Sequence, residues 1–314
     1  MEDAGRLYFD ARILGAPAVL LNYVLIGWLL GRERSKEALL LSAVGNGANI
    51  ILDYWFIYQL GWGSQGAGWA TALSQYTMLG MGLLVLSRIQ RQCPWKDIVS
   101  GLREKDVWRR LFGLNRDILV RTMSLQTAFA LFTNLSALQG TGILVANTVL
   151  LKVLSLASFF IDGYAYATES LSGYYFGQRR YVQLKALLLL TIRASCWTAF
   201  ALVSIFVGFP DQMFGLMTHH RPVLDEIALY SLWLYPVVGL GAIAYALDGY
   251  FIGLTLSVTM RRAMLFSLAI FIAALGFAYS SQNNHLLWGA WAVFMGARVV
   301  TLGRRTPQTW SVQG

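Results

Sequence analysis

The chain has 314 residues, of which 56% are hydrophobic and 13% are charged, and its mean hydropathy is +0.52. Soluble domains carry about 25% charged residues, so this composition excludes an ordinary soluble globular protein and indicates a polytopic membrane protein. The net charge of +9 lies in the loops between apolar segments. We therefore interpret it as a topology signal, with membrane lipids as partners and no nucleic acid.

Nine apolar segments are long enough to cross a bilayer as helices, which takes about 20 residues each. Glycine and proline inside them, such as Gly15, Pro17 and Pro236, are tolerated in membrane helices. We predict an all-α fold, a polytopic membrane helix bundle of about nine transmembrane helices. The predicted spans are 6–31, 38–60, 66–88, 112–138, 142–176, 183–209, 223–253, 262–280 and 284–303.

The basic residues separate the loops into two classes. Of the 25 lysines and arginines, 17 fall in alternate loops and at the C-terminal end, whereas Arg221 alone lies in the opposite loops. Because positive charge marks the cytoplasmic side, we expect the C-terminus in the cytoplasm. An odd number of spans then places the N-terminus outside. With no basic n-region of a signal peptide, this suggests that upstream helices are missing.

The segment 89–111 is the longest predicted non-membrane stretch. It is basic and amphipathic, which predicts a cytoplasmic linker helix on the membrane surface. It divides the chain into three domains: 1–88, the linker 89–111, and 112–314.

A polar stripe interrupts the second predicted span. Asn46, Asn49 and Asp53 stand at i, i+3 and i+7, so a helix places them on one face. A carboxylate facing lipid costs about 2.5–3.5 kcal/mol at a helix centre, so Asp53 is expected to face protein or a wet cavity. Oxygen ligands suit a hard cation. The stripe is either a proton or cation site, with a possible Na⁺ at Asn49 and Asp53, or a structural hydrogen-bonded cluster between helices.

A second group of polar residues lies in the predicted span 142–176. Asp162, Tyr166 and Glu169 stand at i, i+4 and i+7, again on one helical face. The two carboxylates are candidates for binding a cationic substrate or carrying protons, and Asp248 in the span 223–253 is a weaker candidate for the same cavity. The alternative interpretation is structural pairing of these carboxylates with basic residues.

Lys152 and Asp117 need partners inside the predicted membrane region. Lys152 lies near mid-membrane and requires a counter-ion, for which Asp248 and Asp162 are candidates, unless its side chain extends to the outer surface. A fixed cation there would favour neutral or anionic substrates. Asp117 and Arg121 stand at i, i+4 and are expected to pair within one helix.

Signals for other kinds of site are weak. Cys93 and Cys196 have no predicted disulfide partner, the histidines form no spaced metal motif, and no phosphate-binding GxxxxGK[ST] loop occurs. Two DGY triplets, starting at Asp162 and Asp248, lack an accompanying acidic metal motif. We therefore expect no enzyme activity, no catalytic residues and no cofactor beyond a coupling ion, H⁺ or Na⁺.

Five segments of the chain carry a resemblance to a known family: APAVLLNYVLIGWLLG (16–31), GNGANIILDYWFIYQLGWGSQGAGWATALSQY (45–76), LNRDILVRT (114–122), VANTVLLKVLSLASFFIDGYAYATESLSGYYFG (145–177) and LYPVVGLGAIAYALDGYFIG (234–253). Together they resemble the multidrug and toxic compound extrusion (MATE) transporters, in the DNA-damage-inducible protein F branch of that family. Family members have twelve helices in two pseudo-symmetric lobes, and this chain resembles helices four to twelve, without a counterpart for the first three. The resemblance makes 1–88 the C-terminal half of the N-lobe and 112–314 the C-lobe, an incomplete two-lobe fold.

The resemblance implies a secondary active antiporter that exports organic compounds or drugs by alternating access, driven by H⁺ or Na⁺, in the bacterial inner membrane. It implies a cation site in which Asn49 and Asp53 match the family's spacing. Ala67, through its carbonyl, and Thr71 match the helix 6 contributors, whereas the helix 1 Asp has no counterpart here. The substrate cavity would involve Asp162, Tyr166, Glu169, Asp248 and Lys152.

Three alternatives remain open from the residues. A lipid-linked sugar flippase of the same superfamily needs a cationic cavity for diphosphates, and Lys152 alone falls short of one. A membrane-embedded lipid-modifying enzyme needs clustered catalytic residues, such as repeated Asp binding Mg²⁺, whereas the acidic residues here are scattered over different helices. A non-transporting remnant would result if the first three helices are absent from the gene.

Overall fold

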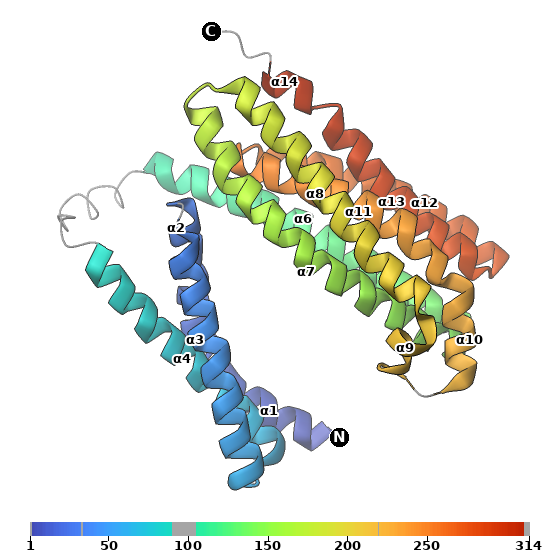
Figure 1. The fold of residues 1–314 in the computed structure, drawn as a ribbon, viewed down its shortest axis with the longest axis horizontal. Coiled ribbons are helices and arrows are strands. Elements are labelled where there is room, and N and C mark those ends of the chain that lie inside the picture. The colour runs from blue at the N-terminus through green and yellow to red at the C-terminus, as the bar shows by residue number, and fades with distance from the viewer. Residues whose placement is uncertain (1, 33, 90–104, 219, 311–314) are drawn as a thin grey trace. The chain divides into compact units, whose positions relative to one another are not determined.

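The computed structural model describes residues 2–32, 34–89, 105–218 and 220–310, and all the regular structure in these ranges is helical (Figure 1). The all-α prediction is therefore confirmed. The chain separates into two compact units, Met1–Glu104 and Lys105–Gly314. Most of the predicted linker helix, and Cys93 with it, lie outside the described residues. Its C-terminal end belongs to a long helix that begins at Lys105.

Unit 1 contains helices that pack mainly around α4. Its elements are α1 (Glu2–Ile13), α2 (Ala16–Gly31), α3 (Ser35–Asp53), the π-helical turn η1 (Tyr54–Gln59) and α4 (Gly63–Ile89). The α1–α2 pair bends by 55° at its break. Pro17 lies in the first turn of α2, where its missing N–H interrupts a continuous helix. Gly15 lets the break between α1 and α2 lie close to α4, because a Cβ at Gly15 would lie 2.9 Å from Cα of Ala72 in α4.

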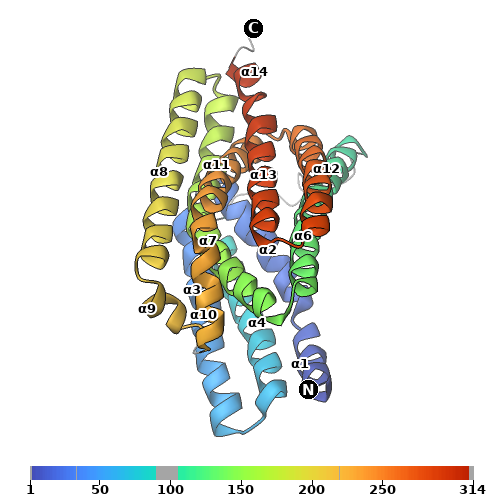
Figure 2. The same cartoon turned by 90° about the vertical axis from the view of Figure 1, so that its right-hand side faces the viewer.

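Unit 2 is a larger bundle (Figures 1 and 2). Its elements are α6 (Lys105–Leu138), α7 (Thr141–Gly177), α8 (Tyr181–Gly208), α9 (Pro210–Gly215), α10 (Arg221–Tyr230), the 3₁₀ turn η2 (Ser231–Trp233), α11 (Leu234–Gly253), α12 (Ser257–Ser281), α13 (Asn284–Gly303) and α14 (Thr306–Trp310). Aromatic side chains pack against one another in its core. Trp291 packs edge-on against Phe132, Phe271 and Phe294, and Phe132 also packs edge-on against Trp288.

The described helices agree closely with the predicted spans. Six of them are long and apolar enough to cross a membrane, or seven if the bent α1–α2 pair forms one span. The two further predicted spans are α3 and α6, which are helical but carry more charged residues, such as Lys36 and Glu37 in α3. The predicted count of nine is therefore approximate.

Helices α7 and α11 approach each other through glycine. A Cβ at Gly249 would collide with the carbonyl oxygen of Ala165 and lie 2.9 Å from its carbonyl carbon. At Gly253 a Cβ would collide with Glu169 in the same way. Small residues at such crossings let helix backbones pack closely in membranes, so this contact brings the two DGY triplets onto neighbouring helices.

A hydrogen-bonded cluster joins the ends of α6, α7 and α13. The Asn147 amide, 1% exposed, donates to Ser136 Oγ and to Asn284 Oδ1, each at 2.8 Å. Its Oδ1 accepts from Asn284 Nδ2 at 3.0 Å and from Trp288 Nε1 at 2.9 Å. Every hydrogen-bonding position of this amide is thus used.

We expect Asn147→Ala to destabilise unit 2 by about 2–3 kcal/mol, because it leaves buried groups of Asn284 and Trp288 unpaired. Thermal unfolding of the purified protein in detergent measures this effect. Asn134→Ala, at an exposed position of α6, is the matched control and should change stability by less than about 0.5 kcal/mol. Equal effects of the two variants would contradict a structural role for the cluster.

Candidate transport site

The predicted coupling pair lies at the C-terminal end of α3. Asn49 and Asp53 are one helical turn apart and both are partly buried. Nδ2 of Asn49 is sealed from solvent and has no hydrogen-bond partner in the described chain. Asp53 forms no hydrogen bond or ion pair with a described residue, and the π-helical turn η1 begins directly after it. The pair thus retains unsatisfied polar groups next to irregular helix, a feature often found at functional sites.

The two further predicted contributors lie on α4. Thr71 Oγ1 donates to the carbonyl oxygen of Ala67 at 2.9 Å. This bond holds the hydroxyl and the carbonyl side by side, so both oxygens are available on one side of the helix to a cation or to a second donor. Thr71 also lines a cavity, whereas Asn49, Asp53 and Ala67 do not.

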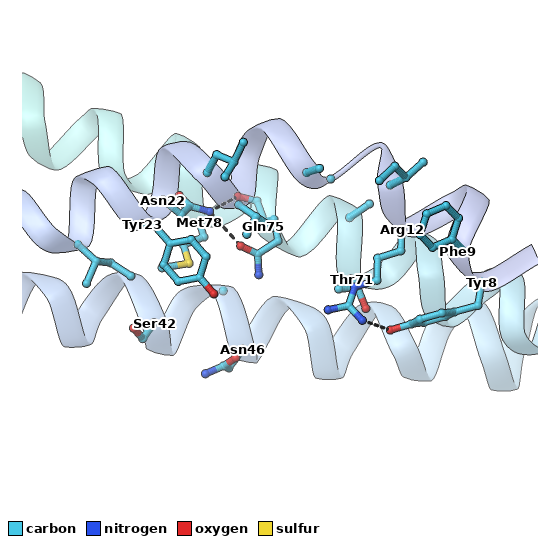
Figure 3. Close-up of a pocket in the computed structure, with 18 residues that line it drawn as sticks. Tyr8, Phe9, Arg12, Asn22, Tyr23, Ser42, Asn46, Thr71, Gln75 and Met78 are labelled. Carbon is cyan, nitrogen blue, oxygen red and sulfur yellow. Dashed lines mark hydrogen bonds between the residues drawn. The ribbon is translucent and has the colours of Figure 1, made fainter. Parts of the chain in front are cut away.

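This cavity lies in the described part of unit 1 (Figure 3). It has a volume of about 740 Å³ and lies among α1, α2, α3 and α4. Asn22 lines the cavity and links α2 to α4. Its Nδ2 donates to the backbone oxygen of Gln75 at 2.9 Å and to Gln75 Oε1 at 3.1 Å. The polar side chains in its lining are Tyr8, Arg12, Asn22, Tyr23, Ser42, Asn46, Thr71 and Gln75.

Unit 2 contains a buried cluster of ions centred on Asp248 of α11. Oδ2 of Asp248 accepts from Arg121 of α6 at 2.7 Å and from Arg298 of α13 at 2.5 Å. Arg298 is 1% exposed, and its guanidinium also lies over the rings of Tyr245 and Phe294. Two guanidinium groups share one carboxylate, so the cluster joins three helices and retains a positive charge.

The predicted acidic face of α7 lies near this cluster. Asp162 is within electrostatic reach of both Asp248 and Arg121, and Glu169 is within reach of Arg121. Both carboxylates are partly buried, and neither has a hydrogen-bond partner among the described residues. Tyr166, from the same face, is 57% exposed. These carboxylates can balance the excess positive charge of the cluster.

The expected counter-ion of Lys152 needs correction. Asp248 is engaged by two arginines instead, and Asp162 is ten positions away on the same helix, about 15 Å along its axis. Within the described chain Lys152 forms no ion pair, and its side chain is exposed. Lysine side chains in membrane helices commonly extend toward the bilayer surface, the alternative expected from the sequence.

The expected pair within α6 is also wrong. Asp117, 3% exposed, pairs with Arg261 of α12 and accepts from Ser257 Oγ at 3.0 Å. Arg121 pairs with Asp248. The neighbouring helices offer each ion a buried partner, and such a partner outweighs an i, i+4 contact worth about 0.2–0.5 kcal/mol. Asp117 and Arg121 therefore form ion pairs between α6 and other helices, and not with each other within α6.

Two solved MATE transporters have the same fold as this chain. A MATE in the straight conformation matches with a TM-score of 0.80 at 21% identity, over 96% of this chain and 68% of that one. An outward-facing multidrug resistance MATE family transporter matches with a TM-score of 0.82 at 20% identity, over 96% of this chain and 69% of that one. No family model matches the sequence.

Curated relatives decide the family. DNA damage-inducible protein F of Escherichia coli is 34% identical over 98% of this chain and 67% of its own length. The chain belongs to the MATE family. Protein DETOXIFICATION 42 of Arabidopsis thaliana is a more distant MATE relative, 26% identical over 95% of this chain, which spans only 57% of that protein's length.

Membership of the MATE family confirms the coarse functional predictions. The chain is an integral membrane protein of a family of drug and compound efflux transporters, and its relatives are transporters rather than enzymes. Among the residues that the structure describes, no group of three or more His, Cys, Asp or Glu side chains is placed to hold a metal ion.

Sequence reasoning missed one member of the Asp248 cluster in this MATE chain. Arg298 was not a candidate, although an arginine in the apolar segment GARVV is the kind of intramembrane charge that usually has a specific partner. A search for ionisable residues at the centre of every predicted span, not only for acids, would have found it.

Proposed function

We propose that this MATE chain is a secondary active antiporter that exports organic compounds or drugs in exchange for H⁺ or Na⁺ by alternating access. The observation that carries the proposal is the 34% identity to DNA damage-inducible protein F across 98% of the chain. We further propose the bacterial inner membrane as its location, with the C-terminus in the cytoplasm. The asymmetric distribution of lysine and arginine over the loops supports this orientation.

In this proposal Asp53 and Asn49 bind the coupling ion, with the Ala67 carbonyl and the Thr71 hydroxyl as further oxygen ligands. The unpartnered Asn49 amide and the unpaired Asp53 carboxylate support this role. In unit 2, the α7 carboxylates Asp162 and Glu169 face the substrate cavity. Asp248, held by two arginines, fixes the charge around them.

The test of coupling uses the whole protein in proteoliposomes, with an imposed H⁺ or Na⁺ gradient and a panel of cationic, neutral and anionic fluorescent compounds. Asp53→Asn should lower gradient-driven transport by about tenfold or more, equivalent to about 1.4 kcal/mol, because it removes the exchangeable charge. The matched control is Asp211→Asn in α9, where the carboxylate is 78% exposed. Unchanged coupling in Asp53→Asn would refute the assignment.

A further inference from the structure

A basic pocket lies between two helices of unit 2, where α12 begins and α13 ends. These helices pack side by side (Figure 2). Both are long and apolar enough to cross a membrane, so the pocket lies at one end of a pair of spans. Its volume of about 330 Å³ is near the lower limit of small-molecule sites, about 300–1,000 Å³. Its lining consists of Thr259, Arg262, Ala263, Phe266, Thr301, Arg304 and Arg305.

Three arginines give this pocket its charge. Arg262 comes from the start of α12, and Arg304 and Arg305 follow directly after α13. All three residues are exposed, and none of them forms an ion pair with a described residue. Nη1 of Arg305 donates to Gln308 Oε1 at 3.2 Å, and this acceptor is neutral. The pocket thus carries three positive charges without a carboxylate in its described lining.

The neighbouring polar groups leave these charges available to a ligand. Asp117, which contacts the start of α12, pairs with Arg261 instead. Thr301 Oγ1 donates to the carbonyl oxygen of Ala297 at 2.7 Å, so the hydroxyl proton of Thr301 is used. The hydroxyl of Thr259 donates to no described residue and is free to donate to a ligand in the pocket. Guanidinium and hydroxyl groups both donate to phosphate oxygens, and arginine–phosphate pairs are among the strong hydrogen-bonded pairs in proteins.

An apolar surface continues from the arginines along α12. Phe266 lines the pocket one helical turn beyond Arg262 and is 58% exposed. Leu265, next to it in the chain, is 45% exposed. Because α12 runs from the pocket into its apolar span, these two side chains lie on the membrane side of the charges. The site therefore combines a cationic pocket with an apolar surface, which matches the charged headgroup and the acyl chains of a phospholipid.

We propose that this pocket binds the phosphate group of an anionic phospholipid, with the acyl chains packed along Phe266 and Leu265 of α12. Basic pockets between membrane helices bind anionic lipid headgroups in this way. With the C-terminus in the cytoplasm, as proposed, the lipid belongs to the inner leaflet. The inference goes beyond the proposed antiport and does not depend on it.

The experiment is a lipid titration of the whole purified protein in detergent, measured by native mass spectrometry. Dioleoyl phosphatidylglycerol and dioleoyl phosphatidylcholine have the same acyl chains and a phosphate each, but phosphatidylcholine has no net charge. Wild type should bind phosphatidylglycerol more tightly, because the described lining offers no carboxylate to the choline cation. The double variant Arg304→Gln, Arg305→Gln should weaken phosphatidylglycerol binding by about tenfold or more, the effect of losing a hydrogen bond to a charged group. Arg304→Lys with Arg305→Lys should keep most of the affinity, because the charge is retained.

Arg179→Gln with Arg180→Gln is the matched control. These two arginines directly precede α8 and are exposed, so their loss removes the same charge, but they lie outside the pocket lining. The control should leave phosphatidylglycerol binding intact. An equal loss of binding in the two double glutamine variants would overturn the inference, and so would equal affinity of wild type for the two lipids. The comparison of lipids needs no variant, so it decides the matter if a variant fails to fold.

Soluble phosphates distinguish a lipid site from a site for a free anion. Inorganic phosphate and glycerol 3-phosphate carry the charged group without acyl chains, so both should displace phosphatidylglycerol only weakly. If either of them bound as tightly as the lipid, the pocket would be a site for a soluble phosphate and the lipid assignment would be wrong.

Discussion

Replacing Gly249 by alanine is expected to lower the thermal midpoint of the protein by about 6–12 °C, which corresponds to about 3 kcal/mol for a unit of this size. The added methyl would meet the backbone of Ala165 on α7. Backbone cannot rotate away as a side chain can, so α7 and α11 must separate. Thermal unfolding in detergent, followed by size-exclusion chromatography, measures the loss.

The control for Gly249→Ala is the equivalent change in the other DGY triplet. A Cβ at Gly163 has no neighbour within 4 Å, and alanine favours a helix over glycine by about 0.8–1 kcal/mol. Gly163→Ala should therefore leave stability unchanged or raise it slightly. If both variants were equally stable, the close contact of α7 with α11 would be wrong.

Asp248→Asn is expected to lower the free energy of unfolding by about 3–5 kcal/mol, because it leaves the buried guanidinium of Arg298 and the partly buried guanidinium of Arg121 without their anion. Arg298 is the more severely affected of the two, since it is 1% exposed. The measurement is again the thermal midpoint, which should fall by about 6–20 °C. The exposed pair of Asp211 and Arg221, 3.8 Å apart, provides the contrast: Asp211→Asn should change stability by less than about 0.5 kcal/mol.

A double-mutant cycle separates pairing from mere burial. Asp248→Asn and Arg298→Met are measured singly and together. If the two side chains act as a pair, the double variant should cost less than the sum of the single variants. Additive costs would contradict the ion pair as a unit. The result also bears on the proposed function, in which Asp248, paired with two arginines, positions charge around Asp162.

Each unit contains both paired and unpaired charges. In unit 2, Asp117 and Asp248 each meet arginine from another helix. In unit 1, Asp53 and Arg12 have no ion-pair partner among the described residues. Unpaired charges inside a membrane protein are expensive and usually functional. In unit 2, Asp162 and Glu169 likewise form no ion pair with a described residue, so the proposed coupling site and the proposed substrate cavity each contain an unpaired carboxylate.

The sequence by itself determined the helices and the faces they present. Hydropathy over about 20 residues and the 3.6-residue period are local properties of the chain, so they predicted the spans and placed Asn49 with Asp53, and Asp162 with Glu169, on single faces. The matching segments also identified the family. None of this required knowledge of which helices touch.

Only the tertiary structure decided the partners of the buried ions. Arg121 pairs with Asp248, 127 positions away, and not with Asp117 on its own helix. Arg298 of α13 pairs with the same carboxylate. Hydropathy and helical period act within one helix and carry no information about which distant helix supplies a counter-ion.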